Sequence, residues 1–216
     1  GEGGAGRGVS GRGEMRLGRG RGGSELLVWD LDKGGAPLLK LEGHTKAVRA
    51  FACHGEGDAR RAVSGGGDKT LLVWDLVKGG APLPKRARVT CEVDAIACHG
   101  EGDARRAVSG GFDKTLLVWD LDKGGAPLLK LKGHTSFVKS IACHGEGDDW
   151  RIVIGSDNYV RLWDGAAGAV YPLGSPVASV ALAPRAGEVD VFAAVGKSFA
   201  RLALRAGPGQ LEERIK

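Results

Sequence analysis

A hydrophobic segment ending in Trp-Asp recurs at a nearly constant interval along this chain. It stands as LLVWDL at 26–31, TLLVWDL at 70–76 and again at 115–121, and VRLWD at 160–164. Its tryptophans, Trp29, Trp74, Trp119 and Trp163, are 45, 45 and 44 residues apart. The neighbouring segment ACHGEGDARRAVSGG also occurs twice, at 52–66 and 97–111. A fixed period of this length indicates an array of one supersecondary unit whose copies stack on one another.

The clearest unit predicts four short strands. They are AVRAFAC at 47–53, ARRAVSG at 59–65, KTLLVWDL at 69–76 and LPKRARV at 83–89. The first alternates apolar and polar residues as a half-buried strand does, and Gly-rich or Gly-Pro turns separate the others. The pattern repeats at 92–132 and 137–173, and 177–205 predicts a degenerate fifth unit of three strands without Trp-Asp. No segment has a helical period, so we expect an all-β fold.

The first 23 residues differ in composition from the repeats. They hold eleven Gly and five Arg but almost no apolar side chains, which is too little to offset the entropy of ordering. We therefore expect a disordered Gly/Arg-rich tail over 1–23. Residues 15–30 nevertheless align without gaps to 60–75, so the stretch near 15–18 is a candidate for a decayed strand of the first unit. Removing this tail leaves about +2 of the +5 net charge.

Composition also restricts the setting of the protein. No apolar run approaches the length of a membrane-spanning helix, and no signal peptide is recognisable at the N-terminus. Three of the four cysteines, Cys53, Cys98 and Cys143 but not Cys91, recur at one repeat position, so they are copies of a repeat residue and form no disulfide framework. We expect a reducing compartment, cytoplasmic or nuclear, and no membrane partner.

Together these residues resemble the WD-repeat β-propeller family. Gly-His, a Ser-x-x-x-Asp about 20 residues later and then Trp-Asp recur at the period of the family. The resemblance implies four-stranded antiparallel blades around a central channel. We expect a propeller over 24–205 with about four to five blades, followed by a C-terminal tail or closing strand at 206–216. The expected blades lie near 24–42, 43–91, 92–132, 133–173 and 174–205.

The family also implies a hydrogen-bonded structural tetrad of His, Ser, Asp and Trp in each blade. The second unit has the full set, the third has Val89 at the His position, and the fourth has Val153 at the Ser position. The first unit keeps only Trp29, with Gly23 at the Asp position, and the fifth keeps none. The implied tetrad residues are His44, Ser64, Asp68, Trp74, Ser109, Asp113, Trp119, His134, Asp157 and Trp163.

Two catalytic or metal alternatives arise from the same residues. A His-Ser-Asp set is also the composition of a hydrolytic triad, but this one recurs with a Trp in a structural repeat, so we expect it to satisfy buried polar groups. The pairs Cys53-His54, Cys98-His99 and Cys143-His144 lack metal-ligand spacing. We expect no catalytic residues, no metal and no cofactor.

Binding positions follow from the family resemblance. The top-face residues of such blades lie three and five positions after the His and just before the turn Asp. Here these positions hold Ala47 and Arg49, Glu92 and Asp94, Phe137 and Lys139, and then Gly67, Phe112 and Ser156. They differ between units whose flanks are nearly copied. We expect Arg49, Glu92, Asp94, Phe112, Phe137 and Lys139 to bind a partner.

The leading hypothesis is therefore a non-enzymatic scaffold that binds a protein or peptide on the top face of the propeller. One alternative is an RNA-associated module that uses the RG-rich tail, although nucleic acid is not the expected partner. Another is a regulatory repeat array of a larger protein. Propellers close with roughly four to eight blades. The chain is therefore expected to be a fragment of a longer propeller, a small closed ring, or an arc completed by another chain through self-association.

Overall fold

The computed structural model describes most of the chain. The described residues are 15–20, 23–30, 34–55, 59–79, 81–83, 87–100, 105–146, 149–163, 168–185, 188–205 and 211–213. Within them the chain forms nineteen strands and no α-helix. The expectation of an all-β fold is confirmed.

The strands form five antiparallel sheets, each built from strands that follow one another in the sequence. Sheet A contains β1 Met15–Arg19, β2 Glu25–Asp30 and β3 Leu39–Glu42. Sheet B contains β4 Val48–His54, β5 Arg61–Gly66, β6 Thr70–Asp75 and β7 Ala87–Arg88. Sheet C contains β8 Val93–His99, β9 Arg106–Gly111, β10 Leu116–Asp120 and β11 Leu129–Leu131. Sheet D contains β12 Ser140–Glu146, β13 Asp149–Ser156, β14 Tyr159–Trp163 and β15 Gly168–Pro172. Sheet E contains β16 Val177–Arg185, β17 Glu188–Val195, β18 Ser198–Arg205 and β19 Leu211–Glu213.

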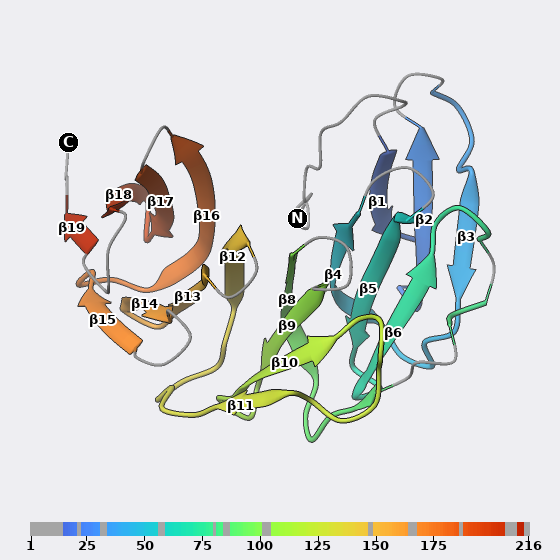
Figure 1. Cartoon of the computed structure of the whole chain (residues 1–216), viewed down its shortest axis with the longest axis horizontal. Coiled ribbons are helices and arrows are strands. Elements are labelled where there is room, and N and C mark those ends of the chain that lie inside the picture. Colours follow the sequence, from blue (N-terminus) through green and yellow to red (C-terminus); the bar gives the residue numbers. More distant parts are fainter. Residues whose placement is uncertain are drawn as a thin grey trace.

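The five sheets follow one another around an open arc (Figure 1). The first strands of sheets B to E, β4, β8, β12 and β16, lie toward the middle of the arc and contact one another in that order. We call these the inner strands. The outer strands, such as β3 at one end and β19 at the other, lie on the periphery. This is the arrangement of blades in a partial β-propeller.

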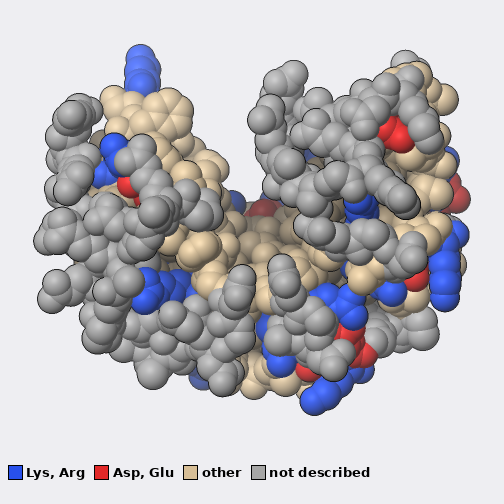
Figure 2. Space-filling model, turned by 45° about the horizontal axis from the view of Figure 1, so that its top comes forward, with Lys and Arg blue, Asp and Glu red and all other residues tan. Residues whose placement is uncertain are grey.

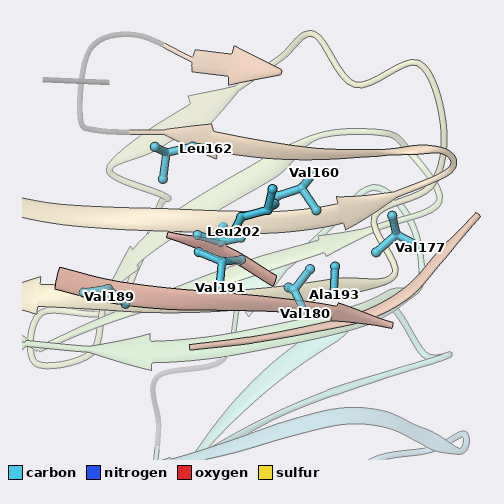
Figure 3. Close-up of a cluster of buried hydrophobic side chains, with 9 residues drawn as sticks. Val160, Leu162, Val177, Val180, Val189, Val191, Ala193 and Leu202 are labelled. Carbon is cyan, nitrogen blue, oxygen red and sulfur yellow. The ribbon is translucent and has the colours of Figure 1, made fainter. Parts of the chain in front are cut away.

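Four apolar clusters hold the five sheets together, one at each boundary between neighbours. Trp74 and Leu72 of sheet B pack on Leu26 and Val28 of sheet A, and similar clusters join B to C, C to D and D to E. Figure 3 shows the last of these, where side chains of β14 meet those of β16, β17 and β18. Among the described residues no cluster joins sheet E to sheet A. Five sheets with four boundaries make an arc whose two end faces are not packed on each other.

Glycine sets the spacing at three of these boundaries. A Cβ on Gly65 of β5 would lie 2.5 Å from Cγ1 of Val93, and one on Gly110 of β9 would lie 2.6 Å from Cγ1 of Val138. A Cβ on Gly155 of β13 would likewise lie 2.8 Å from Cγ1 of Val177. The absence of a side chain on the second strand of each sheet therefore lets the next sheet approach closely.

Sheet A begins inside the segment whose composition predicts a disordered tail. β1 occupies Met15–Arg19, so the tail boundary expected at residue 23 is wrong, and the decayed strand expected near 15–18 is present. Gapless alignment would place Gly18 opposite Val28, but the strands pair Leu17 with Val28. A slip of one residue exchanges the two faces of a strand, and this one buries Leu17 in the core between sheets A and B. Residues 1–14, 21 and 22 lie outside the described part.

Sheets D and E also differ from the sequence expectation. Ile152 pairs with Trp163 as Ala62 pairs with Trp74, so Ile154, not Val153, occupies the position of Ser64. The reason is that the turn between β13 and β14 is one residue shorter than the turn between β5 and β6. Sheet E has four strands instead of the expected three, because β19, from the segment 206–216 expected as a C-terminal tail or closing strand, pairs with β18.

Candidate functional site

The predicted tetrad of sheet B forms one continuous hydrogen-bonded network. His44 lies in the loop before β4. Its Nε2 is 2.7 Å from Ser64 Oγ, and its Nδ1 is 2.9 Å from Asp68 Oδ2. Trp74 Nε1 donates to Ser64 Oγ at 2.8 Å. With a proton on Nδ1, the bonds run in one direction: the indole donates to the hydroxyl, the hydroxyl to Nε2, and Nδ1 to the carboxylate. In this arrangement every polar group of the network has a hydrogen-bond partner while the imidazole is neutral.

Asp68 fixes the turn between β5 and β6 in addition to holding His44. Its Oδ1 accepts hydrogen bonds from Thr70 Oγ1 (2.7 Å) and Thr70 N (3.1 Å), and its Oδ2 accepts one from Thr45 N (2.8 Å). Partial burial acts to raise the pKa of this carboxyl, but the bonds from Thr70, Thr45 and His44 outweigh it and hold the pKa below the ordinary value. The charged carboxylate is therefore part of the folded state.

The location of this network argues for a structural role over a hydrolytic triad. Ser64 has no exposed surface and its oxygen already accepts the indole N–H, so no substrate can reach the hydroxyl. A nucleophile must be accessible and have oxyanion donors nearby. The network instead ties together a loop, the second strand, a turn and the third strand of one sheet.

Sheet C keeps half of this network and replaces the rest. Trp119 Nε1 donates to Ser109 Oγ at 2.8 Å, as in sheet B. Val89 stands at the His position, and the carboxylate of Asp113 accepts hydrogen bonds from Thr90 Oγ1 and from Thr115 Oγ1. A threonine hydroxyl thus takes part of the role of the missing imidazole.

Sheet D keeps the His and the Trp but lacks the group that joins them. Both ring nitrogens of His134 and Nε1 of Trp163 are buried without a hydrogen-bond partner within the described part of the chain. Ile154 offers no hydroxyl where Ser64 stands in sheet B, and the predicted member Asp157 lies in the shortened turn with a φ of 42°. Burial, with a smaller effect of Arg161, lowers the pKa of His134 to about 4. Sheet D therefore carries an uncompensated polar cost.

The repeated cysteines line the inner strands and form no metal centre. Cys98 and Cys143 are half-buried, and burial is the main cause that raises the pKa of both thiols. No group of three or more His, Cys, Asp or Glu side chains in the described ranges is placed to hold a metal ion. His99 stacks on Trp150 with ring centroids 4.8 Å apart, a contact that the sequence did not predict because Trp150 stands outside the Trp-Asp series.

Five of the six predicted partner-binding residues form one connected group, which we call the rim cluster: Arg49, Glu92, Asp94, Phe112 and Phe137. The guanidinium of Arg49 on β4 bridges to Glu92 Oε2 at 3.0 Å and to the carboxylate of Asp94 on β8. It also lies 5.4 Å from the centre of the Phe112 ring. The Phe112 and Phe137 rings are 4.5 Å apart. Residues from three sheets thus meet at one surface.

The rim cluster is accessible although its members contact one another. Phe112 and Phe137 are 41% and 40% exposed, an unusual exposure for two aromatic rings in contact. Lys139, the sixth predicted residue, is exposed, and only its backbone has a described hydrogen bond, to Gly155. Of the other top-face positions, Ser156 is buried and donates to the Phe137 carbonyl at 3.0 Å, which fixes the loop that carries that ring.

No single charge sign dominates the face drawn in Figure 2. Lys and Arg side chains lie among Asp and Glu side chains there, and the molecule is hollowed at the top centre of the view. No helix in the described part of the chain is long and apolar enough to cross a membrane. The RG-rich segment that underlies the RNA alternative lies mostly outside the described residues.

Repeated antiparallel sheets on an arc, joined by copies of one apolar boundary and one polar network, define a propeller-type repeat protein. The family model "WD domain, G-beta repeat" matches residues 35–75 and 125–164. Each matched segment starts just before the outer strand of one sheet, β3 or β11, and ends at the Trp-Asp of the next sheet. Over these two segments the chain is similar to the repeats of the WD-repeat family. No curated protein matches it.

Proposed function

We propose that this chain is a non-enzymatic scaffold that binds a protein or peptide segment at the rim cluster. WD repeats are typically protein-interaction scaffolds and are generally non-catalytic. The observation that carries the proposal is the pair of exposed, touching rings of Phe112 and Phe137 beside the ion-paired Arg49. Exposed aromatic and Arg side chains in contact are the usual anchors of protein interfaces.

Charge and geometry support this location. Arg49 faces two carboxylates, Glu92 and Asp94, so the rim cluster carries one net negative charge beside its apolar rings. The ion pairs also hold the guanidinium of Arg49 near Phe112 before any partner arrives. This side chain therefore loses less conformational entropy on binding. An apolar anchor of the partner would rest on the two rings, and its polar groups would meet the surrounding charges.

The test compares identical substitutions at two exposed phenylalanines. Phe137→Ala removes one ring of the rim cluster, whereas Phe199→Ala removes a ring that is 78% exposed on sheet E. Partners are captured with the full chain, identified by mass spectrometry, and their affinities are then measured for both variants and for Asp94→Lys. We expect Phe137→Ala and Asp94→Lys to weaken the partner at least tenfold, and Phe199→Ala to leave it unchanged.

Two results would count against the proposal. One is that the wild type, Phe137→Ala and Asp94→Lys capture the same proteins with the same affinities. The other is equal weakening by Phe199→Ala, which would indicate non-specific apolar adhesion. Circular dichroism of each variant serves as the folding control, since the exposed rings contribute little to the core.

A further inference from the structure

Sheet D carries an arginine where sheet B has a buried leucine. Arg161 on β14 pairs with Ile154 on β13. The matching pair in sheet B is Leu72 on β6 with Ser64 on β5, and Leu72 is buried. The guanidinium of Arg161 reaches the loop before β12, where a Cβ on Gly133 would lie 2.8 Å from Nη1. A positive charge thus enters the part of sheet D that holds its tetrad residues.

No described carboxylate balances this charge. Arg161 makes no ion pair or hydrogen bond within the described ranges, and its Nε is buried. In sheet B the carboxylate of Asp68 accepts a hydrogen bond from the backbone N–H of Thr45. In sheet D the hydroxyl of Tyr159 accepts the corresponding bond from the N–H of Thr135, at 3.2 Å. A neutral phenol thus replaces an anionic group in the sheet to which a cation is added.

Two further side chains in this part of sheet D have buried nitrogens without partners. They are the imidazole of His134, which is only 6% exposed, and the indole of Trp163. Their counterparts in sheet B, His44 and Trp74, both bond to one serine hydroxyl. Arg161 lies near enough to His134 to contribute, after burial, to the low pKa of its imidazole. Three unpartnered nitrogen groups therefore converge on the tetrad position of sheet D.

The balance of donors and acceptors indicates what would satisfy these groups. The Nε–H of Arg161, the indole N–H of Trp163 and one N–H of a neutral His134 are three donors. The second imidazole nitrogen is the single acceptor among them. A water molecule would accept two of these bonds, but it would bring two more donors and no charge. A small anion accepts from several donors at once and offsets the guanidinium charge, so the arrangement favours an anion over water.

We propose that sheet D binds a small monovalent anion of the chloride type between Arg161, His134 and Trp163. The guanidinium supplies the positive charge and an N–H donor, and the imidazole and the indole supply the other donors. The anion thereby links the loop before β12 to β14, as Ser64 and Asp68 link the corresponding loop and third strand of sheet B. This site is separate from the rim cluster, and the inference does not rest on the proposed function.

The test compares urea unfolding of the full chain at pH 7 in sodium chloride and in sodium gluconate of equal concentration. An anion that binds only the folded state raises the folding constant, about tenfold in 0.5 M chloride for a site with a Kd of about 50 mM. We expect this gain for the wild type and its loss in Arg161→Leu, which inserts the residue that sheet B has there. Lys130→Leu, which removes an exposed cation of β11, should keep the gain. His134→Val should stabilise the fold more in gluconate than in chloride, because it removes a donor to the anion.

Chlorine NMR measures the binding directly, without reference to unfolding. The folded wild type should broaden the chloride signal, and added bromide should remove the excess line width in a saturable way, a result that does not require Arg161→Leu to fold. The proposal is overturned if the wild type has the same folding constant in both salts, if Arg161→Leu responds to chloride as the wild type does, or if bromide removes no excess line width. A chain with Phe137→Ala should keep the chloride response, which separates this site from the proposed function.

Discussion

The same substitution should have opposite effects at two equivalent positions of this protein. His44 and His134 occupy the same place before the inner strands of sheets B and D. His44 has partners on both ring nitrogens, whereas neither ring nitrogen of His134 has a hydrogen-bond partner among the described residues. Valine already stands at this position in sheet C, as Val89, so the repeat tolerates it. We expect His134→Val to stabilise the fold and His44→Val to destabilise it.

The magnitudes follow from the hydrogen-bond accounting. A buried unpaired polar group costs roughly 1–3 kcal/mol, and His134→Val removes two such nitrogens. The smaller side chain leaves a cavity that costs about 1 kcal/mol in return. The net gain is about 1–5 kcal/mol, or roughly 2–20 °C in Tm for a chain of this size. His44→Val removes the acceptor of Ser64 and a donor to Asp68, at a cost of about 2–4 kcal/mol.

Urea unfolding at pH 7, followed by tryptophan fluorescence, measures both effects. The two variants should move the midpoint in opposite directions with an unchanged slope, since the surface exposed on unfolding is nearly the same. A double variant should show nearly additive effects, because the two sites lie in non-adjacent sheets. If His134→Val lowers stability as much as His44→Val does, the unpaired imidazole has a partner in solution, and the structural contrast between sheets B and D is wrong.

Three other outcomes follow from the structure. Burial lowers the pKa of His99 and His134 to about 4, so the unfolded chain takes up these protons first as pH falls below about 6.5. The stability that the neutral imidazoles contribute is present above pH 6.5 and is lost as the pH falls toward 4. The loss is roughly 1–2 kcal/mol per histidine after solvent screening. Urea titrations at a series of pH values measure this loss, and an unfolding free energy that does not change with pH would contradict it. Gly110→Ala places a Cβ 2.6 Å from Val138 Cγ1 and should destabilise the fold by about 1–3 kcal/mol, as measured by thermal unfolding. Gly125→Ala is the control: its Cβ would have no atom within 4 Å, but its φ is positive, so it tests the backbone effect alone. Among the described residues no apolar cluster covers the outer face of sheet A or of sheet E. The protein should therefore self-associate with rising concentration, and a sedimentation profile that stays monomeric at 100 µM would refute this.

The sequence predicted the repeat architecture because periodicity survives changes of individual residues. Four Trp-Asp pairs at a constant interval established the unit, its strands and the all-β class. The network of His44, Ser64, Asp68 and Trp74 could be named in advance because the sequence resembles the WD-repeat family, which implies such a tetrad. The meeting of Arg49 with Asp94 also follows from the period, since the two are 45 residues apart and lie at the same level of adjacent sheets.

What the sequence could not predict depends on register. Leu17 pairs one position away from its gapless alignment, because burying a leucine is worth more than keeping the turn length constant. Ile154 takes the serine position through a turn shortened by one residue. Both differences are single-residue slips, and a pattern of period two cannot show a slip when the turn beside it has no fixed length.

The repeated glycine–valine approach has a consequence for how such a chain can grow. Gly65 receives Val93, Gly110 receives Val138 and Gly155 receives Val177, so sheets B, C and D each offer the following sheet the same glycine–valine contact. An in-frame duplication of about 45 residues between sheets C and D would meet a fitting surface on each side. The length of the array can therefore change by recombination alone, without compensating substitutions at the new junction.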